Sequence, residues 1–253
     1  MSRTKWFEFH QLGWLPDYLK VRQLEGIFQI LKSAGFDRSL LTQFRKLQAK
    51  TRADIYLDLG SGAGNVIKFL AEKCGDRVKF ILSDINPKTD SYQLLKQTYP
   101  QIDYIPQSVD IATAGEILKG KTITMISTFH ELDRMQAQQA IGKLFGHSRG
   151  FLIIEPFGKW WKQMLLFPVM LVSFFLVPFR VRPWNHGMFI FTWLIPLLPL
   201  MHTHDGLVSW LRSYGEGDFR QMISDSSPVG WEWESDCNGW SLSYLLAWRK
   251  SEA

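Results

Sequence analysis

Strand-like and helix-like segments alternate through the middle of the chain, and this alternation restricts the fold more than any other feature. Five segments rich in isoleucine, leucine, valine and phenylalanine are predicted as strands: 55–60, 79–84, 102–107, 122–128 and 150–157. The segments predicted as helices between them are 64–73, 89–97, 112–118 and 133–146. Strands connected through helices form a parallel sheet with helices on both faces. The sequence therefore predicts an α/β fold built on a doubly wound sheet.

The segments on either side extend this plan. Helices are predicted at 5–35 and 39–50, and a hairpin at 231–236 and 241–249 turns at Asn238-Gly239. The hairpin adds an antiparallel edge pair to the five parallel strands. We therefore expect a Rossmann-like, mostly parallel sheet of seven strands with an N-terminal helical cap, and 253 residues suffice for this domain plus an insertion.

A glycine-rich loop follows the first predicted strand directly, in the order Asp58-Leu59-Gly60-Ser61-Gly62-Ala63-Gly64-Asn65. Glycines let the backbone turn tightly and approach a ligand, and the helix that follows presents free N–H groups. In a doubly wound sheet such a loop lies beside the topological switch point, where ligands bind. A dinucleotide fingerprint would place its third glycine or alanine where this chain has Asn65, and no phosphate-loop lysine follows. The loop predicts a ligand site and disfavours a nicotinamide dinucleotide.

Acidic residues end the second predicted strand and follow the third. Asp84 can accept hydrogen bonds from both hydroxyls of a ribose. Asp110 suits an adenine amino group, with Val109 flanking the ring. Asp84 alone does not separate the possible cofactors, since several nucleotides carry a ribose.

Together these motifs resemble the class I S-adenosylmethionine (SAM)-dependent methyltransferases over about residues 50–160, with the hairpin at 231–249 as the family's final strands. Asp58 and the three loop glycines match the family's first motif, Asp84 its second and Asp110 its third. The resemblance implies SAM as cofactor, with its amino-acid end over the loop and its ribose on Asp84. The residues it implies at the cofactor are Asp58, Gly60, Ser61, Gly62, Gly64, Asp84, Ile85, Val109, Asp110 and Ser127.

Two further segments are similar to a bacterial branch of this family that carries an apolar insertion. They are Trp6–Pro16 and His204–Arg212. The implied function is methyl transfer from SAM, which makes the chain an enzyme. A non-catalytic SAM-binding module that docks on membranes is the alternative, and a nicotinamide-dependent enzyme is disfavoured by the loop.

The candidates for chemistry at the methyl acceptor are His130 and Glu131, just after the fourth predicted strand, and Glu155, which ends the fifth. Methyl transfer gains much of its rate from positioning, and a base is needed only where the acceptor must lose a proton. His130 titrates near neutrality and suits that task. The alternative is that His130 and Glu131 only begin the next helix and that Glu155 is a structural carboxylate.

The sequence disfavours a nucleic-acid partner and a bound metal ion. Family members that methylate nucleic-acid amino groups carry Asn/Asp-Pro-Pro-aromatic after the fourth strand, whereas this chain reads Ser127-Thr128-Phe129-His130. With a net charge of only +5 and no run of basic residues, no nucleic-acid partner is expected. No metal site is predicted either, because His202, His204 and Asp205 lack a convincing further ligand.

Residues 160–205 interrupt the α/β pattern with two uncharged segments, 164–179 and 183–201, on either side of Arg180 and Arg182. Each segment is marginal for crossing a bilayer core of about 30 Å. We expect membrane contact, with a buried lid or a homodimer interface as the alternative. The acceptor is then a hydrophobic or membrane-associated small molecule, and the chain a cytoplasmic protein at the inner face of the membrane. The expected division is 1–50 (cap), 51–159 with 206–253 (core) and 160–205 (insertion).

Overall fold

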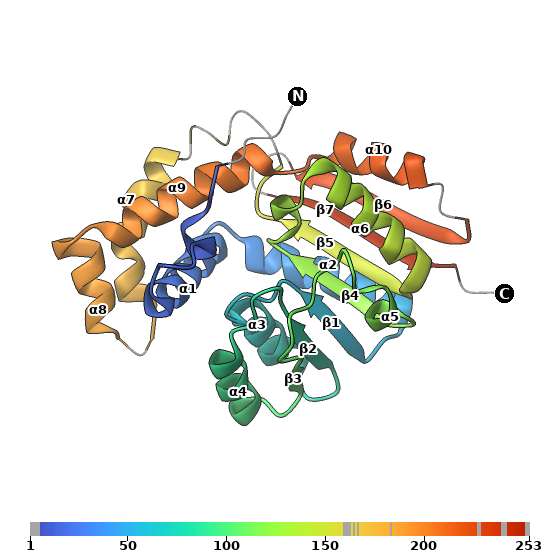
Figure 1. Cartoon of the computed structure of the whole chain (residues 1–253), viewed down its shortest axis with the longest axis horizontal. Helices are drawn as coiled ribbons and strands as arrows, with labels where there is room; N and C mark the ends of the chain where they lie inside the picture. Colours follow the sequence, from blue (N-terminus) through green and yellow to red (C-terminus); the bar gives the residue numbers. More distant parts are fainter. Residues whose placement is uncertain are drawn as a thin grey trace.

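A computed structural model of the chain describes residues 6–158, 163, 165, 167–182, 184–226, 229–238 and 242–250. Seven strands form one sheet in the order β3-β2-β1-β4-β5-β7-β6 (Figure 1). Their bounds are β1 Ile55–Leu59, β2 Lys79–Ser83, β3 Ile102–Tyr104, β4 Thr122–Ile126, β5 Gly150–Glu155, β6 Trp231–Asn238 and β7 Leu242–Arg249. Strands β1 to β5 run parallel, and β7 pairs antiparallel with β5 and β6. The predicted doubly wound sheet is confirmed, and its order reverses between β1 and β4.

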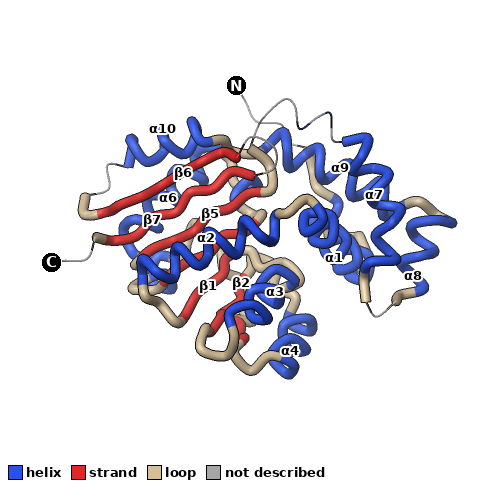
Figure 2. Tube along the Cα trace, turned by 180° about the vertical axis from the view of Figure 1, so that it is seen from behind, coloured by secondary structure: helices blue, strands red, loops and turns tan. Residues whose placement is uncertain are grey.

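Helices cover both faces of this sheet. On one face lie α2 (Phe36–Thr51), α3 (Asn65–Cys74) and α4 (Thr89–Thr98), with α2 crossing the strands in Figure 2. On the other lie α5 (Gly115–Leu118), α6 (Arg134–His147) and α10 (Glu216–Ser226). Successive residues of β1 serve the two cores, because a strand alternates its side chains: Tyr56 packs with α2 and Leu57 with α6. This double burial explains the almost continuous apolar runs in the strands.

A helical cap stands beside the carboxyl end of the sheet (Figure 1). It contains η1 (Phe9–Gln11), α1 (Asp17–Ser33), α7 (Phe167–Arg180), α8 (His186–Phe189), the π-helical turn η4 (Ile190–Leu194) and α9 (Leu197–Arg212). Its own core joins Leu19 and Ile30 of α1 to Phe174 of α7 and Met201 of α9. The N-terminal segment and the apolar insertion are therefore one packed layer.

The structure departs from the sequence-based expectations in several places. Helix α9 runs through the expected boundary at 205 because Asp205 and Val208 are buried against the rest of the cap. Helix α10 and the short turn η2 (Phe129–Glu131) were not expected. The predicted turn residue Gly239 lies outside the described residues. In the described part of the chain, no helix is both long and apolar enough to cross a bilayer.

Candidate active site

A cavity of about 390 Å³ opens between the carboxyl ends of the central strands and the cap. That volume falls in the usual range of small-molecule sites, about 300–1,000 Å³. The sequence-predicted cofactor residues that line it are Gly60, Ser61, Gly62, Asp84, Ile85, Val109, Asp110 and Ser127. The structure thus brings together residues from four loops that the chain order keeps apart.

Asp58 and Gly64 lie behind the cavity wall rather than in it. The Asp58 carboxylate accepts hydrogen bonds from Ser61 Oγ (2.7 Å) and Thr124 Oγ1 (2.6 Å), so it holds the glycine loop onto the sheet from beneath. Burial raises the pKa of Asp58 to about 7, although these two hydrogen bonds oppose the shift. Gly64 has φ +82°, and a Cβ there would overlap Leu95. Both residues shape the loop without touching the cavity.

Asp84 fixes the other side of the same loop. Its Oδ2 accepts from the Gly62 amide (2.8 Å) and its Oδ1 from the Asn86 amide (2.8 Å). Each carboxylate oxygen has a second lone pair, so Asp84 can accept ligand hydroxyls as well. The Val109 amide donates to the Asp84 carbonyl (2.9 Å), which brings Val109 to the cavity edge near Ile85. This arrangement suits a ribose with a flat ring beside it.

Ser127, at the end of β4, carries two signs of a binding site. Its φ is +56°, a left-handed conformation that costs a residue other than glycine about 1–3 kcal/mol. Its hydroxyl oxygen is buried and has no hydrogen-bond partner, and the residue lines the cavity. Buried polar atoms are rarely left unsatisfied in proteins. A polar ligand at this wall would satisfy the Ser127 hydroxyl.

The predicted acceptor-side residues also meet at the cavity. His130 Nδ1 lies 2.6 Å from Glu155 Oε2, while Glu155 Oε1 accepts from the amides of Thr128 (3.1 Å) and Phe129 (2.7 Å). His130 and Glu131 line the cavity, and Glu155 is fully buried behind His130. Burial by itself would lower the pKa of His130, but Glu155 and the nearby carboxylates outweigh it and raise the pKa to about 9.

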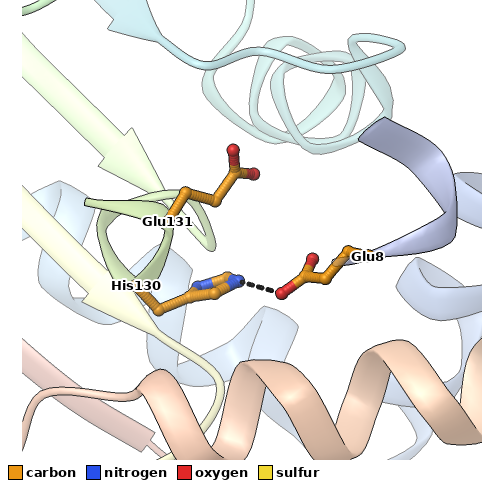
Figure 3. A group of neighbouring side chains, drawn as sticks. All are labelled: Glu8, His130 and Glu131. Atoms are coloured by element: carbon orange, nitrogen blue, oxygen red, sulfur yellow. Dashed lines mark ion pairs between the residues drawn. The ribbon is translucent and has the colours of Figure 1, made fainter. Parts of the chain in front are cut away.

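Glu8 is a site residue that the sequence analysis missed (Figure 3). It is 1% exposed, and its Oε1 lies 3.7 Å from His130 Nε2, 3.7 Å from Arg212 Nη1 and within hydrogen-bond distance of Ser209 Oγ (3.2 Å). The only sequence signal was an acidic residue inside the aromatic stretch Trp6–Phe9.

Glu8, His130 and Glu131 offer possible metal-ligand atoms that all lie within 4.8 Å of one another. In the described part of the chain, no other group of three histidine, cysteine, aspartate or glutamate side chains meets this distance. This group could hold a cation, which no pattern of residues in the sequence indicated. A protonated imidazole cannot coordinate a metal, so binding at His130 requires loss of its Nε2 proton.

A second cluster of polar groups, centred on Asp205, connects three segments of the cap through hydrogen bonds. Asp205 accepts from the Phe9 amide (2.9 Å) and from His204 Nδ1 (3.0 Å) on one oxygen, and from Gln23 Nε2 (2.6 Å) on the other. His202 contacts the carbonyls of Leu198 and Gln23, and burial lowers its pKa to about 4. The side chains considered as metal ligands are thus engaged with protein groups. Asp205 fastens the segment that carries Glu8 to α9.

Two helices of the cap line part of the cavity with apolar side chains. Helix α1 contributes Leu24, Ile27 and Phe28 to this wall, and α7 contributes Met170 and Phe174. The cavity wall therefore combines polar loops at the sheet with an apolar stretch from α1 and α7, while Lys20, Asp205 and Ser209 add polar groups from the cap.

Comparison with known proteins gives the fold. A scan against protein-family models found no match, and neither did a search of curated proteins. Among solved structures, human N-acetylserotonin methyltransferase in complex with SAM is 16% identical with a TM-score of 0.52, over 92% of this chain and 56% of that one. The plantazolicin methyltransferase BpumL, in complex with a triazolic desmethylPZN analogue and SAH, is 10% identical with a TM-score of 0.53, over 94% of this chain and all of that one.

The methyltransferase domain of bacterial CtHen1 gives a TM-score of 0.50 at 13% identity, over 82% of this chain and 96% of that one. The chain has the class I methyltransferase fold. It spans less than two thirds of the first two chains matched, 59% and 56%. At these identities the likeness extends to the fold alone, because one fold hosts many activities.

Proposed function

We propose that this protein transfers a methyl group from SAM to a hydrophobic acceptor. One observation carries the proposal: a single cavity joins the glycine loop, Asp84 and Asp110 to His130 and to an apolar wall. The other support is the fold, whose solved examples include enzymes crystallised with SAM or SAH.

SAM, when bound, supplies an electrophilic methyl group on a sulfonium. In this proposal Asp84 accepts hydrogen bonds from the ribose hydroxyls, and Asp110 accepts one from the adenine amino group. Ile85 and Val109 supply apolar surface for the ring, and the unsatisfied Ser127 hydroxyl gives a further polar contact. These residues hold the cofactor, so that positioning provides much of the rate.

At the acceptor, His130 is proposed to remove a hydroxyl proton through Nε2. Glu155 accepts from Nδ1–H, which fixes the ring and its tautomer and stabilises the imidazolium that forms. Glu8 and Glu131 face the same ring and add negative charge beside it.

The proposed acceptor class follows from the apolar side chains that α1 and α7 add to the cavity wall. Aliphatic and aromatic side chains of α1 and α7 would contact the body of the acceptor while its hydroxyl meets His130. The same helix α7 exposes apolar residues on its outer side. We therefore propose a membrane-associated acceptor and a place for the protein at the inner face of the membrane.

Titration calorimetry tests the cofactor: SAM and SAH should bind in the micromolar range and NAD should not. Transfer is then tested by incubating the protein and methyl-labelled SAM with a lipid extract and following label into the organic phase, with His130→Ala as control. Tighter binding of NAD than of SAM would contradict the cofactor. If SAM binds but no label moves into any extract, the non-catalytic SAM-binding alternative is preferred.

A further inference from the structure

The outer surface of the cap exposes many large apolar side chains, as surfaces that bind a partner do. Val169, Val172, Leu176 and Phe179 recur at helical spacing along α7 and are all exposed, Val172 to 65%. The opposite side of the same helix is buried in the cap core through Phe174 and Val177. Helix α7 is thus apolar on both sides, whereas a helix of a soluble surface normally has a polar outer face.

Neighbouring segments extend this surface. Trp193 and Leu194 of η4 are 55% and 76% exposed, and Trp193 packs edge to face on Phe175 and Phe179 of α7. Trp184 contacts Phe189 in the same way. We call these exposed side chains the outer cap surface: Val169, Val172, Leu176, Phe179, Trp184, Ile190, Trp193, Leu194 and Ile195. Contiguous apolar surface of this kind marks a contact with protein or membrane.

The positive charge of residues 156–204 indicates which kind of partner binds this surface. No aspartate or glutamate occurs between Glu155 and Asp205, whereas Arg180 ends α7 and Arg182 follows two residues later. Both arginines are exposed, and Arg182 stacks over Trp184 at 4.4 Å. Tryptophan and arginine beside apolar residues are typical of the boundary between lipid headgroups and acyl chains.

A second copy of the chain fits this surface less well. A two-fold contact sets the same patch against itself, so the arginines of both copies would enter one interface in which the surface offers no acidic residue to pair with them. Anionic lipid headgroups supply that negative charge.

We propose that the outer cap surface docks on the face of an anionic bilayer, with α7 and η4 inserted to the depth of the headgroup boundary. This deepens the proposed function, because Met170 and Phe174 of α7 line the cavity. The acceptor would reach His130 along the helix that touches the lipid. An interfacial position needs no spanning helix, since such segments insert only about 5–10 Å.

Vesicle flotation of the full chain tests the docking without cofactor or acceptor. Wild-type protein should float with vesicles of phosphatidylcholine and phosphatidylglycerol, and more weakly with phosphatidylcholine alone. Val172→Glu should reduce binding at least tenfold, because it removes an inserted side chain and adds a charge. Leu94→Glu is the matched control, since Leu94 is equally exposed, at 65%, on α4 and lies outside the outer cap surface. Arg180→Gln and Arg182→Gln should each weaken binding to the anionic vesicles roughly fivefold.

Three results would overturn the docking proposal: wild-type protein that floats with neither vesicle, equal losses in Val172→Glu and Leu94→Glu, or a wild-type dimer that Val172→Glu converts to a monomer. SAM affinity and the melting temperature, measured on each variant, confirm that the fold is intact. If the vesicles bind but SAM does not, only the proposed methyl transfer fails. If SAM binds but the vesicles do not, the docking and the proposed place at the membrane fail, whereas the proposed methyl transfer stands.

Discussion

His130 Nδ1 lies 2.6 Å from Glu155 Oε2, and both side chains are buried at the carboxyl edge of the sheet. Glu155 from β5, Glu131 from η2 and Glu8 from the N-terminal segment all face this imidazole, and Arg212 of α9 faces Glu8. Three carboxylates around one ring explain why its pKa rises despite burial.

The first prediction concerns pH and activity. The base form of His130 is the neutral ring, which becomes the main species only above its pKa of about 9. We therefore expect the rate with a hydroxyl acceptor to rise about tenfold per pH unit from neutrality and to level off near that pKa. Glu155→Gln removes the strongest stabiliser of the imidazolium, so the plateau should begin at lower pH. A rate independent of pH in the wild type would exclude His130 as the base.

The second prediction concerns Glu8, which we regard as a positioning residue. Glu8→Gln keeps the shape and a hydrogen-bonding group near Ser209 but removes the charge 3.7 Å from His130 Nε2. The pKa of His130 should fall, and the pH profile should shift in the same direction as in Glu155→Gln but by less. A merely structural role would leave the profile in place and change only the melting temperature. Both are measured on the same preparation.

The third prediction concerns Asp84. Asp84→Ala should weaken SAM binding by roughly 1–3 kcal/mol, because it removes a charged acceptor from the ribose. It also releases the amides of Gly62 and Asn86, so the loop itself would loosen. Asp84→Asn separates the two effects, since its one carbonyl oxygen can keep one amide contact. Calorimetry that finds wild-type affinity in Asp84→Ala would show that this carboxylate does not face the ribose.

The fourth prediction concerns the stability of the glycine loop. Gly64 and Gly35 both have a left-handed backbone, with φ and ψ of +82° and 4° at Gly64 and of +82° and 10° at Gly35. A Cβ at Gly64 would overlap Leu95, whereas a Cβ at Gly35 meets open space. Gly35→Ala should therefore cost only the backbone strain, about 1–2 kcal/mol. Gly64→Ala should cost clearly more, because strain and overlap add. Denaturant unfolding of both variants gives the comparison, and equal losses would mean that the loop absorbs the extra atom.

Much of the fold could be predicted because its signals are local. The apolar runs of β1, β2, β4 and β5 and the glycine loop are contiguous in sequence, so a doubly wound sheet and a ligand site followed from spacing and known topology rules. Asp84 and Asp110 could be placed at the cavity for the same reason, since both follow parallel strands that end at one edge.

For helix α10 and for the position of Asp58, the local sequence was not enough to predict the structure. Helix α10 has a short and mostly polar sequence, and its helical state depends on burying Phe219, Met222 and Ile223 against the sheet. The sequence motif predicted Asp58 as a cofactor contact. In the structure its carboxylate lies under the glycine loop, where it accepts hydrogen bonds from Ser61 and Thr124. This position depends on how β1 and β4 lie side by side in the sheet.

The sequence by itself determined the doubly wound sheet and the loop at its switch point, because residue periodicity and glycine spacing act over a few neighbouring positions. Only the tertiary structure decided that Glu8 meets His130, that Asp205 fastens the N-terminal segment, and that one side of α7 faces the cavity while the other is exposed. These contacts join segments far apart in the chain. They depend on how helices pack against one another, which no local pattern of residues specifies.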